Sequence, residues 1–157
     1  MTFAFFDCLV LNTVMAARAL TRRYDKVLRP FEISVVQFTV LMTVQNSPRM
    51  SVNSMAARIS MDRTTLLRNL EPLSKRGLVI AGRPEKGNVR HFELTEKGAA
   101  LLEEILPLWR DSQDELRALS TGQAIAGPAL VIDPGPEDFL GGLRALTAGE
   151  ARQQADA

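Results

Sequence analysis

The chain has 157 residues, 46% of them hydrophobic and 24% charged, which is the length and composition of one globular domain. One cysteine (Cys8) and one histidine (His91) exclude an internal disulfide and paired-histidine metal sites, and no apolar run reaches the roughly 18 residues of a membrane span. Within the net charge of +1, a basic block of +5 over residues 58–91 lies beside an acidic block of −6 over residues 103–157, and the remaining residues contribute +2. We therefore expect a cytoplasmic single domain without metal or cofactor. The charge division fits an anion-binding surface, and it fits equally the ordinary fluctuation of charge along a sequence.

The first predicted helix covers about residues 7–28, where apolar residues recur at a helical period. This segment carries Asp7 and no basic leader, so it does not have the pattern of a signal peptide. Pro30 ends the helix. A Ser-x-x-Gln capping box at Ser34 predicts a second helix, which stops before Pro48.

Two shorter helices are predicted next, each behind a good N-cap residue. Ser51 can cap the third helix and Asp62 the fourth. In the fourth helix, three leucines at helical spacing are expected to face a core: Leu66, Leu70 and Leu73. Pro72 predicts a bend or an early end of this helix, and Gly77 matches a left-handed C-cap.

The period then changes from helical to alternating. Turn residues 85–88 separate two short apolar runs, which predicts a β-hairpin built on Leu78, Ile80, Phe92 and Leu94. His91 is next to Phe92 and is therefore expected to face outward on this hairpin, either as a plain surface residue or in reach of phosphate.

The C-terminal part is expected to be helical and then irregular. Thr95 can cap a long helix that reaches about residue 119, and Pro107 is expected to kink it. Glycine and proline give the segment 120–136 the composition of a linker. A last short helix is predicted over residues 136–146, followed by a disordered tail over residues 147–157.

A helix pair followed by a basic hairpin is the order of a winged helix-turn-helix. The N-terminus of a capped helix offers free backbone N–H groups to phosphate. Thr64, Thr65 and Arg68 near that end can reach base edges in a major groove. A basic helix face is usually only solvated, but the combination favours DNA binding. The predicted fold class is mainly α with a small β-hairpin wing, a winged helix-turn-helix plus a helical dimerisation region.

Several motifs occur in a familiar order: Ala19-Leu20-Thr21-Arg22-Arg23-Tyr24-Asp25, Pro30, Ser34-Val35-Val36-Gln37-Phe38, Asp62-Arg63-Thr64-Thr65-Leu66, Leu73-Ser74-Lys75-Arg76-Gly77-Leu78-Val79 and Glu93-Leu94-Thr95-Glu96-Lys97-Gly98. Together they resemble the MarR family of transcriptional regulators over residues 8–119. The resemblance implies a homodimer held by both chain ends, which binds a pseudo-palindromic double-stranded DNA operator. It also implies release by a small ligand, often an aromatic one, so we expect a repressor of transcription.

The pattern and the resemblance together assign regions and contacts. Residues 34–98 form the winged helix-turn-helix, and residues 1–30 and 99–146 form the dimerisation helices. DNA contacts are expected from Ser51, Arg63, Thr64, Thr65, Arg68, Lys86, Asn88 and Arg90. A small aromatic or anionic ligand is expected to be reached by Arg18, Arg22, Tyr24 and Phe38. Met15 and Trp109 are expected in the core or the dimer interface rather than against a ligand.

Some residues keep other functions open. The family commonly has Thr or Ser where Leu67 stands, and an Asp-x-Arg wing motif where Lys86 and Asn88 stand, with Arg90 as a candidate replacement. These departures permit a winged-helix protein–protein adaptor that does not bind DNA. Cys8 lies in the helix where some members sense oxidants, although a lone cysteine among apolar residues is more often simply buried.

An enzyme is disfavoured, because the chain shows no nucleophile–base pair, no metal-ligand spacing and no phosphate-binding loop. The dependence of random-duplex binding on salt separates the two remaining readings. A DNA-binding protein loses affinity steeply as salt rises, whereas an adaptor need not bind duplex DNA at all.

Overall fold

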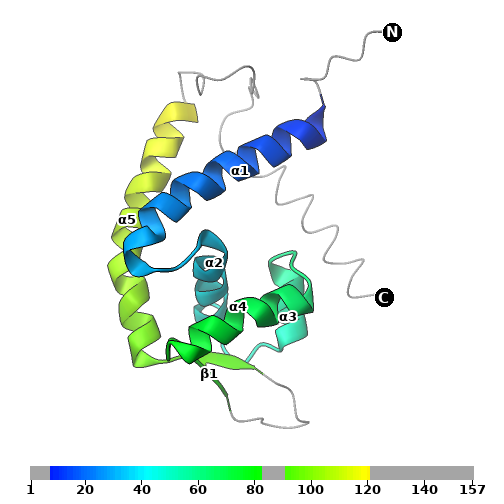
Figure 1. The fold of residues 1–157 in the computed structure, drawn as a ribbon, viewed down its shortest axis with the longest axis vertical. Coiled ribbons are helices and arrows are strands. Elements are labelled where there is room, and N and C mark those ends of the chain that lie inside the picture. The colour runs from blue at the N-terminus through cyan, green and yellow to red at the C-terminus, as the bar shows by residue number, and fades with distance from the viewer. Residues whose placement is uncertain (1–7, 83–90, 121–157) are drawn as a thin grey trace.

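A computed structural model of the chain describes residues 8–82 and 91–120. In chain order these residues form α1 (Leu9–Leu28), the 3-10 turn η2 (Arg29–Phe31), α2 (Val35–Gln45), α3 (Val52–Arg58), α4 (Arg63–Lys75), β1 (Val79–Ala81), β2 (Phe92–Leu94) and α5 (Glu96–Ser120). Figure 1 shows α2 near the centre, with the long helices α1 and α5 on one side and α3, α4 and the strands on the other. The predicted class, mainly helical with one β-hairpin, is confirmed.

Local sequence signals set the helix ends where they were predicted. Ser34 and Gln37 form both hydrogen bonds of the capping box, at 3.2 and 3.1 Å. The side chains of Ser51 and Asp62 each accept a hydrogen bond from the backbone N–H three residues further on, and so begin α3 and α4. Gly77 ends α4 in the left-handed region at φ +70°. Such a cap favours glycine, which has no Cβ to clash.

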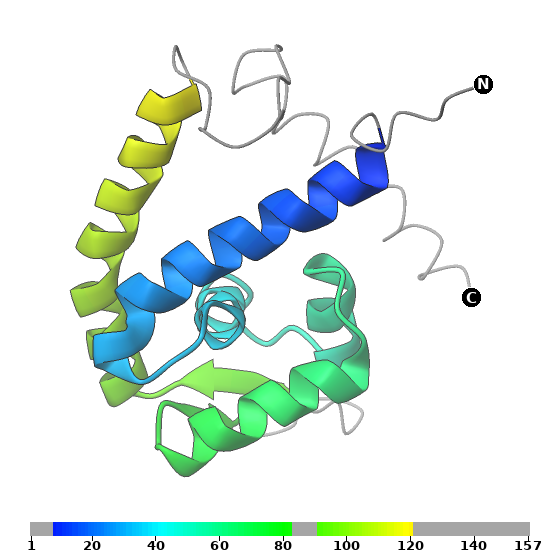
Figure 2. The same cartoon turned by 45° about the horizontal axis from the view of Figure 1, so that its top comes forward.

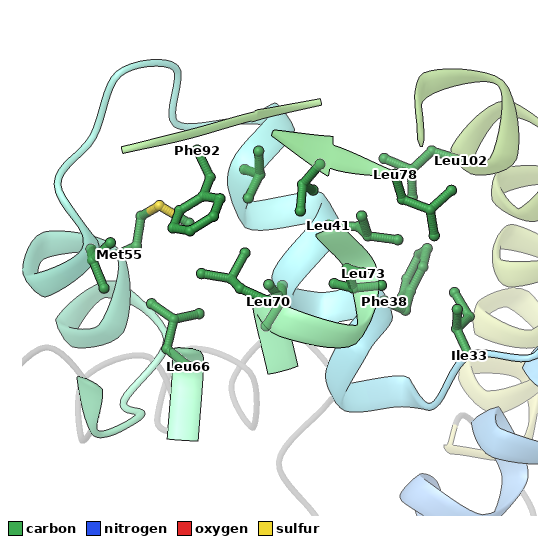
Figure 3. Packing of buried hydrophobic residues seen from close by; sticks show 14 of the residues in the cluster. Ile33, Phe38, Leu41, Met55, Leu66, Leu70, Leu73, Leu78, Phe92 and Leu102 are labelled. Carbon is green, nitrogen blue, oxygen red and sulfur yellow. The ribbon is translucent and has the colours of Figure 1, made fainter. Parts of the chain in front are cut away.

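The core lies where α2, α3, α4, the two strands and α5 meet (Figure 3). The three leucines of α4 that were expected to face it are fully buried, and so is Leu41 of α2. Burying one leucine side chain contributes about 1.5–3 kcal/mol relative to leaving it exposed. This shared core fixes the orientation of α4 against α2, and Figure 2 shows α4 running along the edge of the molecule with one face directed outward.

The two interior prolines do not end their helices. The early end expected at Pro72 is not observed, because α4 continues to Lys75. Likewise α5 runs through Pro107 to Ser120 as one helix. A proline removes one backbone donor from the helix, and the buried faces of α4 and α5 pack strongly enough to keep both helices intact.

The hairpin differs from the prediction in which side chains it buries. β1 and β2 pair antiparallel with Ile80 opposite Glu93. Of the apolar residues on which the hairpin was predicted, Ile80 is 50% exposed, and β1 buries Val79 beside it. His91, expected outside, is 5% exposed. Its ring fills the space that Gly82 leaves open, since a Cβ on Gly82 would lie 2.0 Å from His91 Nε2.

The first helix packs only through its C-terminal half. Tyr24 and Leu28 are buried, but Val10 is 71% and Met15 is 44% exposed, although both belong to a helix rich in apolar residues. Among the described residues, no single helix is long and apolar enough to cross a membrane. The pair Val10–Phe31 and Val35–Gln45 meets that requirement only jointly, with a bend of 76° between them. The predicted linker, last helix and tail, over residues 120–136, 136–146 and 147–157, lie outside the described residues except for Ser120.

Candidate DNA-binding surface and ligand cavity

The N-terminal end of α4 is an exposed, positively charged surface. Arg63, Thr64 and Arg68 are all exposed there. Among the described residues, neither arginine forms a hydrogen bond or an ion pair. One free guanidinium at the helix N-terminus, where backbone N–H groups also favour anions, and a second guanidinium one and a half turns further on form a surface suited to phosphate and to base edges.

Asp62 and Thr65 are occupied with each other at this helix end. The backbone N–H of Thr65 donates to Asp62 Oδ1 at 2.8 Å, and its hydroxyl donates to Oδ2 at 2.5 Å. These hydrogen bonds from the Thr65 side chain and backbone hold the pKa of the Asp62 carboxyl below its ordinary value. The Thr65 hydroxyl proton is therefore committed to the cap, and its oxygen can only accept a further hydrogen bond.

Of the predicted DNA contacts that remain, Ser51 alone lies among the described residues. Ser51 caps α3, and its hydroxyl lies 2.8 Å from that of Ser54. Lys86, Asn88 and Arg90 lie outside the described residues. Leu67, which stands where the resembled family commonly has Thr or Ser, is half-buried against the core and so does not face outward with Arg68.

A cavity of about 350 Å³ lies among four helices, lined by Tyr24 of α1, by Val35, Phe38, Thr39, Met42 and Thr43 of α2, by Asn46, by Arg58 of α3 and by Trp109 of α5. The rings of Phe38 and Trp109 are 6.2 Å apart at a tilt of 42°. The amide of Gln113 donates a hydrogen bond to the hydroxyl of Tyr24. The cavity is open to solvent, and its mainly apolar wall with three aromatic side chains suits a small aromatic molecule.

Two of the four predicted ligand residues, Tyr24 and Phe38, line this cavity. Arg18 and Arg22 do not line it and are exposed on α1. Sequence reasoning missed Arg58 and placed Trp109 in the core or the interface. The spacing of Trp109 on its helix marks an inward position, but no local pattern shows which inward positions border a cavity.

Arg58 gives the cavity its positive charge. It is exposed at the C-terminal end of α3, which belongs to the predicted helix-turn-helix. Among the described residues it has no hydrogen-bond or ion-pair partner. A free guanidinium beside aromatic rings suits an anionic aromatic ligand, because it can pair with a carboxylate while the rings cover the apolar part.

Cys8 lies at the N-cap position of α1, half-buried and away from the cavity. Its side chain does not cap the helix. Its backbone carbonyl accepts hydrogen bonds from the backbone N–H and the side-chain amide of Asn12.

A capped helix pair, α3 and α4, followed by an antiparallel hairpin, defines the class of winged helix-turn-helix proteins. The crystal structure of the M. tuberculosis transcriptional regulator MosR matches with a TM-score of 0.73 and 33% identity, covering 94% of this chain and 99% of that one. A MosR structure in complex with DNA matches with a TM-score of 0.71 at the same identity, covering 92% of this chain and 97% of that one. The chain therefore belongs to the MarR family of transcriptional regulators.

Other comparisons are more distant. The chain is 25% identical over 88 residues to the HTH-type transcriptional regulator SarZ of Staphylococcus aureus. That match covers 55% of this chain and 60% of SarZ. No protein-family model matches the sequence.

Proposed function

We propose that the protein is a homodimeric, sequence-specific DNA-binding repressor of transcription and not an enzyme. The exposed N-terminal end of α4, with two arginines that have no partner among the described residues, carries this proposal. MosR, at 33% identity over nearly its whole length, has been solved in complex with DNA, which supports it. A regulator of bacterial type acts where the chromosome lies, so we place the protein in the cytoplasm.

Arg68 is the residue we assign to base reading. It lies on the outer face of α4, opposite the buried Leu66 and Leu70, one and a half turns from the N-cap. Arg63 and Thr64 precede it at the helix start, where they reach phosphate or bases. The remaining contacts are assigned to backbone phosphates, from Ser51 and from Lys86, Asn88 and Arg90 in the segment after β1.

The proposal is tested by measuring two variants on two duplexes. One duplex is a site that the wild-type protein selects from a random-sequence library, called here the selected site, and the other is random DNA. Arg68→Ala is expected to weaken the selected site by about 10–100-fold more than random DNA, because an Arg–guanine contact discriminates by about 1–3 kcal/mol. Lys86→Ala is expected to lower the affinity for both duplexes equally. It should also reduce the slope of log affinity against log salt concentration by about one unit per subunit.

Lys26→Ala is the control, because Lys26 is an exposed cation on α1, outside the helix-turn-helix. This variant should bind both duplexes with the wild-type affinity. Equal losses on both duplexes for Arg68→Ala would show that α4 does not read sequence through this residue. A wild-type protein that binds neither duplex at low salt would instead favour the adaptor without DNA binding.

The exposed apolar residues of α1 support a homodimer. Val10, Val14, Met15 and Leu20 are all exposed, and a soluble chain seldom leaves so many large apolar side chains together on one helix. Pairing with a second copy covers such a surface symmetrically. We assign α1 and α5 to the dimer scaffold, and a monomer in sedimentation at micromolar concentration would contradict this assignment.

The cavity is proposed to bind the releasing ligand, an aromatic anion whose ring packs against the paired rings of Phe38 and Trp109 and whose carboxylate pairs with Arg58. The probes are 4-hydroxyphenylacetate and salicylate, with binding measured by calorimetry and DNA release by fluorescence anisotropy. Arg58→Gln should lower the affinity for both acids by about tenfold or more, since a charge-assisted hydrogen bond is lost.

Arg18→Gln is the matched control for this test. It removes the same charge from an exposed residue that does not line the cavity, so ligand affinity should not change. A loss in Arg18→Gln without a loss in Arg58→Gln would move the anion site to the outer face of α1. If neither acid binds the wild-type protein, the aromatic-anion assignment is wrong.

A further inference from the structure

The C-terminal end of α4 is held by Arg76, which the sequence places in the basic block and in a family motif but to which it assigns no contact of its own. Arg76 Nη1 donates to the carbonyl of Glu32 at 2.6 Å, and Nη2 donates to the carbonyl of Phe31 at 2.9 Å. Both carbonyls belong to the connection between α1 and α2. One guanidinium therefore joins the end of α4 to a segment 44 and 45 residues earlier in the chain.

The two acceptors are well suited to this planar fork. They are carbonyls at the end of the η2 turn, which has no following turn to satisfy them. Glu32 adopts φ 55°, and its N–H donates back to the carbonyl of Arg29, which fixes the direction of the segment. A lysine could reach one of these oxygens, but it has no second donor in a fixed plane.

α5 holds the same end of α4 from another side. Lys97 Nζ donates to the carbonyl of Arg76 at 2.9 Å, and Thr95 Oγ1 donates to the carbonyl of Gly77 at 2.7 Å. Gly98 lies so close that a Cβ on it would be 2.1 Å from the carbonyl oxygen of Leu78. The end of α4 is thus bound both to the α1–α2 connection and to the first turn of α5.

The neighbouring Lys75 shows what a solvated cation at this place does. It is exposed, and its one partner among the described residues is Glu71, one turn away on the same helix, at 2.7 Å. Arg76 is half-buried and has two of its donors directed into the protein. Two adjacent basic residues therefore have different roles, and only the tertiary contact separates them.

We propose that Arg76 is a positioning residue, which holds α4 at a set angle to the α1 and α5 scaffold and thereby sets the half-site spacing that the dimer accepts. The inference rests on the proposed function. In a dimeric helix-turn-helix protein, the two recognition helices enter major grooves about 34–36 Å apart, so the angle of each helix to the scaffold decides which spacing fits. Arg76 acts through α4 and makes no contact with DNA.

The test compares Arg76→Lys with Lys75→Gln on three duplexes: the selected site, the same site with one base pair inserted at its centre, and random DNA. Arg76→Lys keeps the positive charge but loses the paired donors of the guanidinium. Lys75→Gln removes a positive charge and leaves the Arg76 guanidinium in place. The insertion rotates one half-site by about 35°, so wild type should discriminate strongly between the two spacings.

Arg76→Lys is expected to weaken the selected site by about tenfold, to bind both spacings with similar affinity, and to bind random DNA with unchanged affinity and salt slope. Lys75→Gln should keep the wild-type ratio of affinities for the two spacings. Arg76→Gln should lose this preference as Arg76→Lys does, and the second Arg76 variant keeps the test valid if one of them folds poorly.

Two results overturn the inference while leaving the proposed function intact. In the first, the Arg76 variants keep the wild-type ratio between the spacings, while Arg68→Ala still loses specificity. In the second, Arg76→Gln lowers the affinity for all three duplexes alike and reduces the salt slope, which would make Arg76 a phosphate contact. A wild-type protein that prefers no site would refute the proposed function itself, and this inference with it.

Discussion

The two ends of α4 differ in what holds them. At the N-terminal end, Asp62 caps the helix by accepting hydrogen bonds from the backbone and hydroxyl of Thr65, and the nearby Arg63 and Arg68 have no partner among the described residues. At the C-terminal end, the Arg76 side chain donates to two carbonyls of the α1–α2 connection. The hydroxyl of Thr95, at the start of α5, donates to the carbonyl of Gly77. One end is left free for an outside partner, and the other is tied to the scaffold.

This division follows from what DNA recognition requires. A helix that reads base edges has to present its donors unpaired, because a side chain already bonded within the protein offers DNA no donor. Its direction must still be defined, since displacing the contacts by about an ångström loses much of their geometry. The anchored end supplies the direction, and the free end supplies the contacts.

The largest effect is expected from the core face that both ends share. Leu66 lies near the free end and Leu73 near the anchored end, and both are fully buried. Replacing either with alanine should lower the free energy of unfolding by about 2–5 kcal/mol, through lost burial and the cavity left behind. Denaturant unfolding measures this, and a loss confined to Leu73→Ala would mean that the free end is not packed as described.

The anchored end can be disrupted at Gly98. Its added Cβ would lie 2.1 Å from a backbone oxygen of Leu78, so Gly98→Ala should destabilise the fold by about 1–3 kcal/mol. This prediction opposes helix propensity, which favours alanine over glycine by about 1 kcal/mol within a helix. A higher melting temperature for Gly98→Ala would show that α5 does not pack so closely on the end of α4.

A smaller loss of stability is expected at Gly77, where the backbone conformation, and not the room for a side chain, disfavours other residues. No atom lies within 4 Å of a Cβ built on Gly77, but its φ is +70°. Gly77→Ala should therefore cost about 1 kcal/mol from the left-handed conformation alone. Gly77→Asn is the matched control and should cost less, because asparagine adopts this conformation more readily. Equal costs for both variants would argue against the C-cap.

The smallest effect concerns the free end and depends on pH. The pKa of Asp62 is lowered in the folded protein, chiefly by the hydroxyl of Thr65, so its ionised form stabilises the fold. That contribution is complete above the ordinary value of 3.8 and is lost as the pH falls through the lower folded pKa. The advantage of wild type over Asp62→Ala should disappear in acid, as seen in melting temperatures between pH 2 and pH 6.

Thr65→Val sharpens this prediction. It removes the largest cause of the shift and leaves the backbone hydrogen bond in place, so the pKa of Asp62 should return toward its ordinary value. A carboxyl titration by NMR that shows no change between wild type and Thr65→Val would show that the hydroxyl does not bind Asp62 in solution.

The sequence determined the elements whose defining interactions span few residues. The capping box at Ser34, the N-cap at Asp62 and the left-handed Gly77 depend on hydrogen bonds or dihedral angles within one helical turn, so a local pattern is enough to predict them. The apolar face of α4 follows from its period for the same reason. With these elements in order, the winged-helix class and the family could both be predicted.

The tertiary structure alone decided which residues share a site. Trp109 meets Phe38 at the cavity across 71 positions of the chain, and Arg76 meets the carbonyls of Phe31 and Glu32 across 45 and 44. The burial of His91 depends on the missing side chain of Gly82, which follows β1 and donates its N–H to the carbonyl of His91. Neither charge nor period encodes such pairings, because a long-range contact depends on how all the intervening elements pack, and a single stretch of sequence contains no record of that packing.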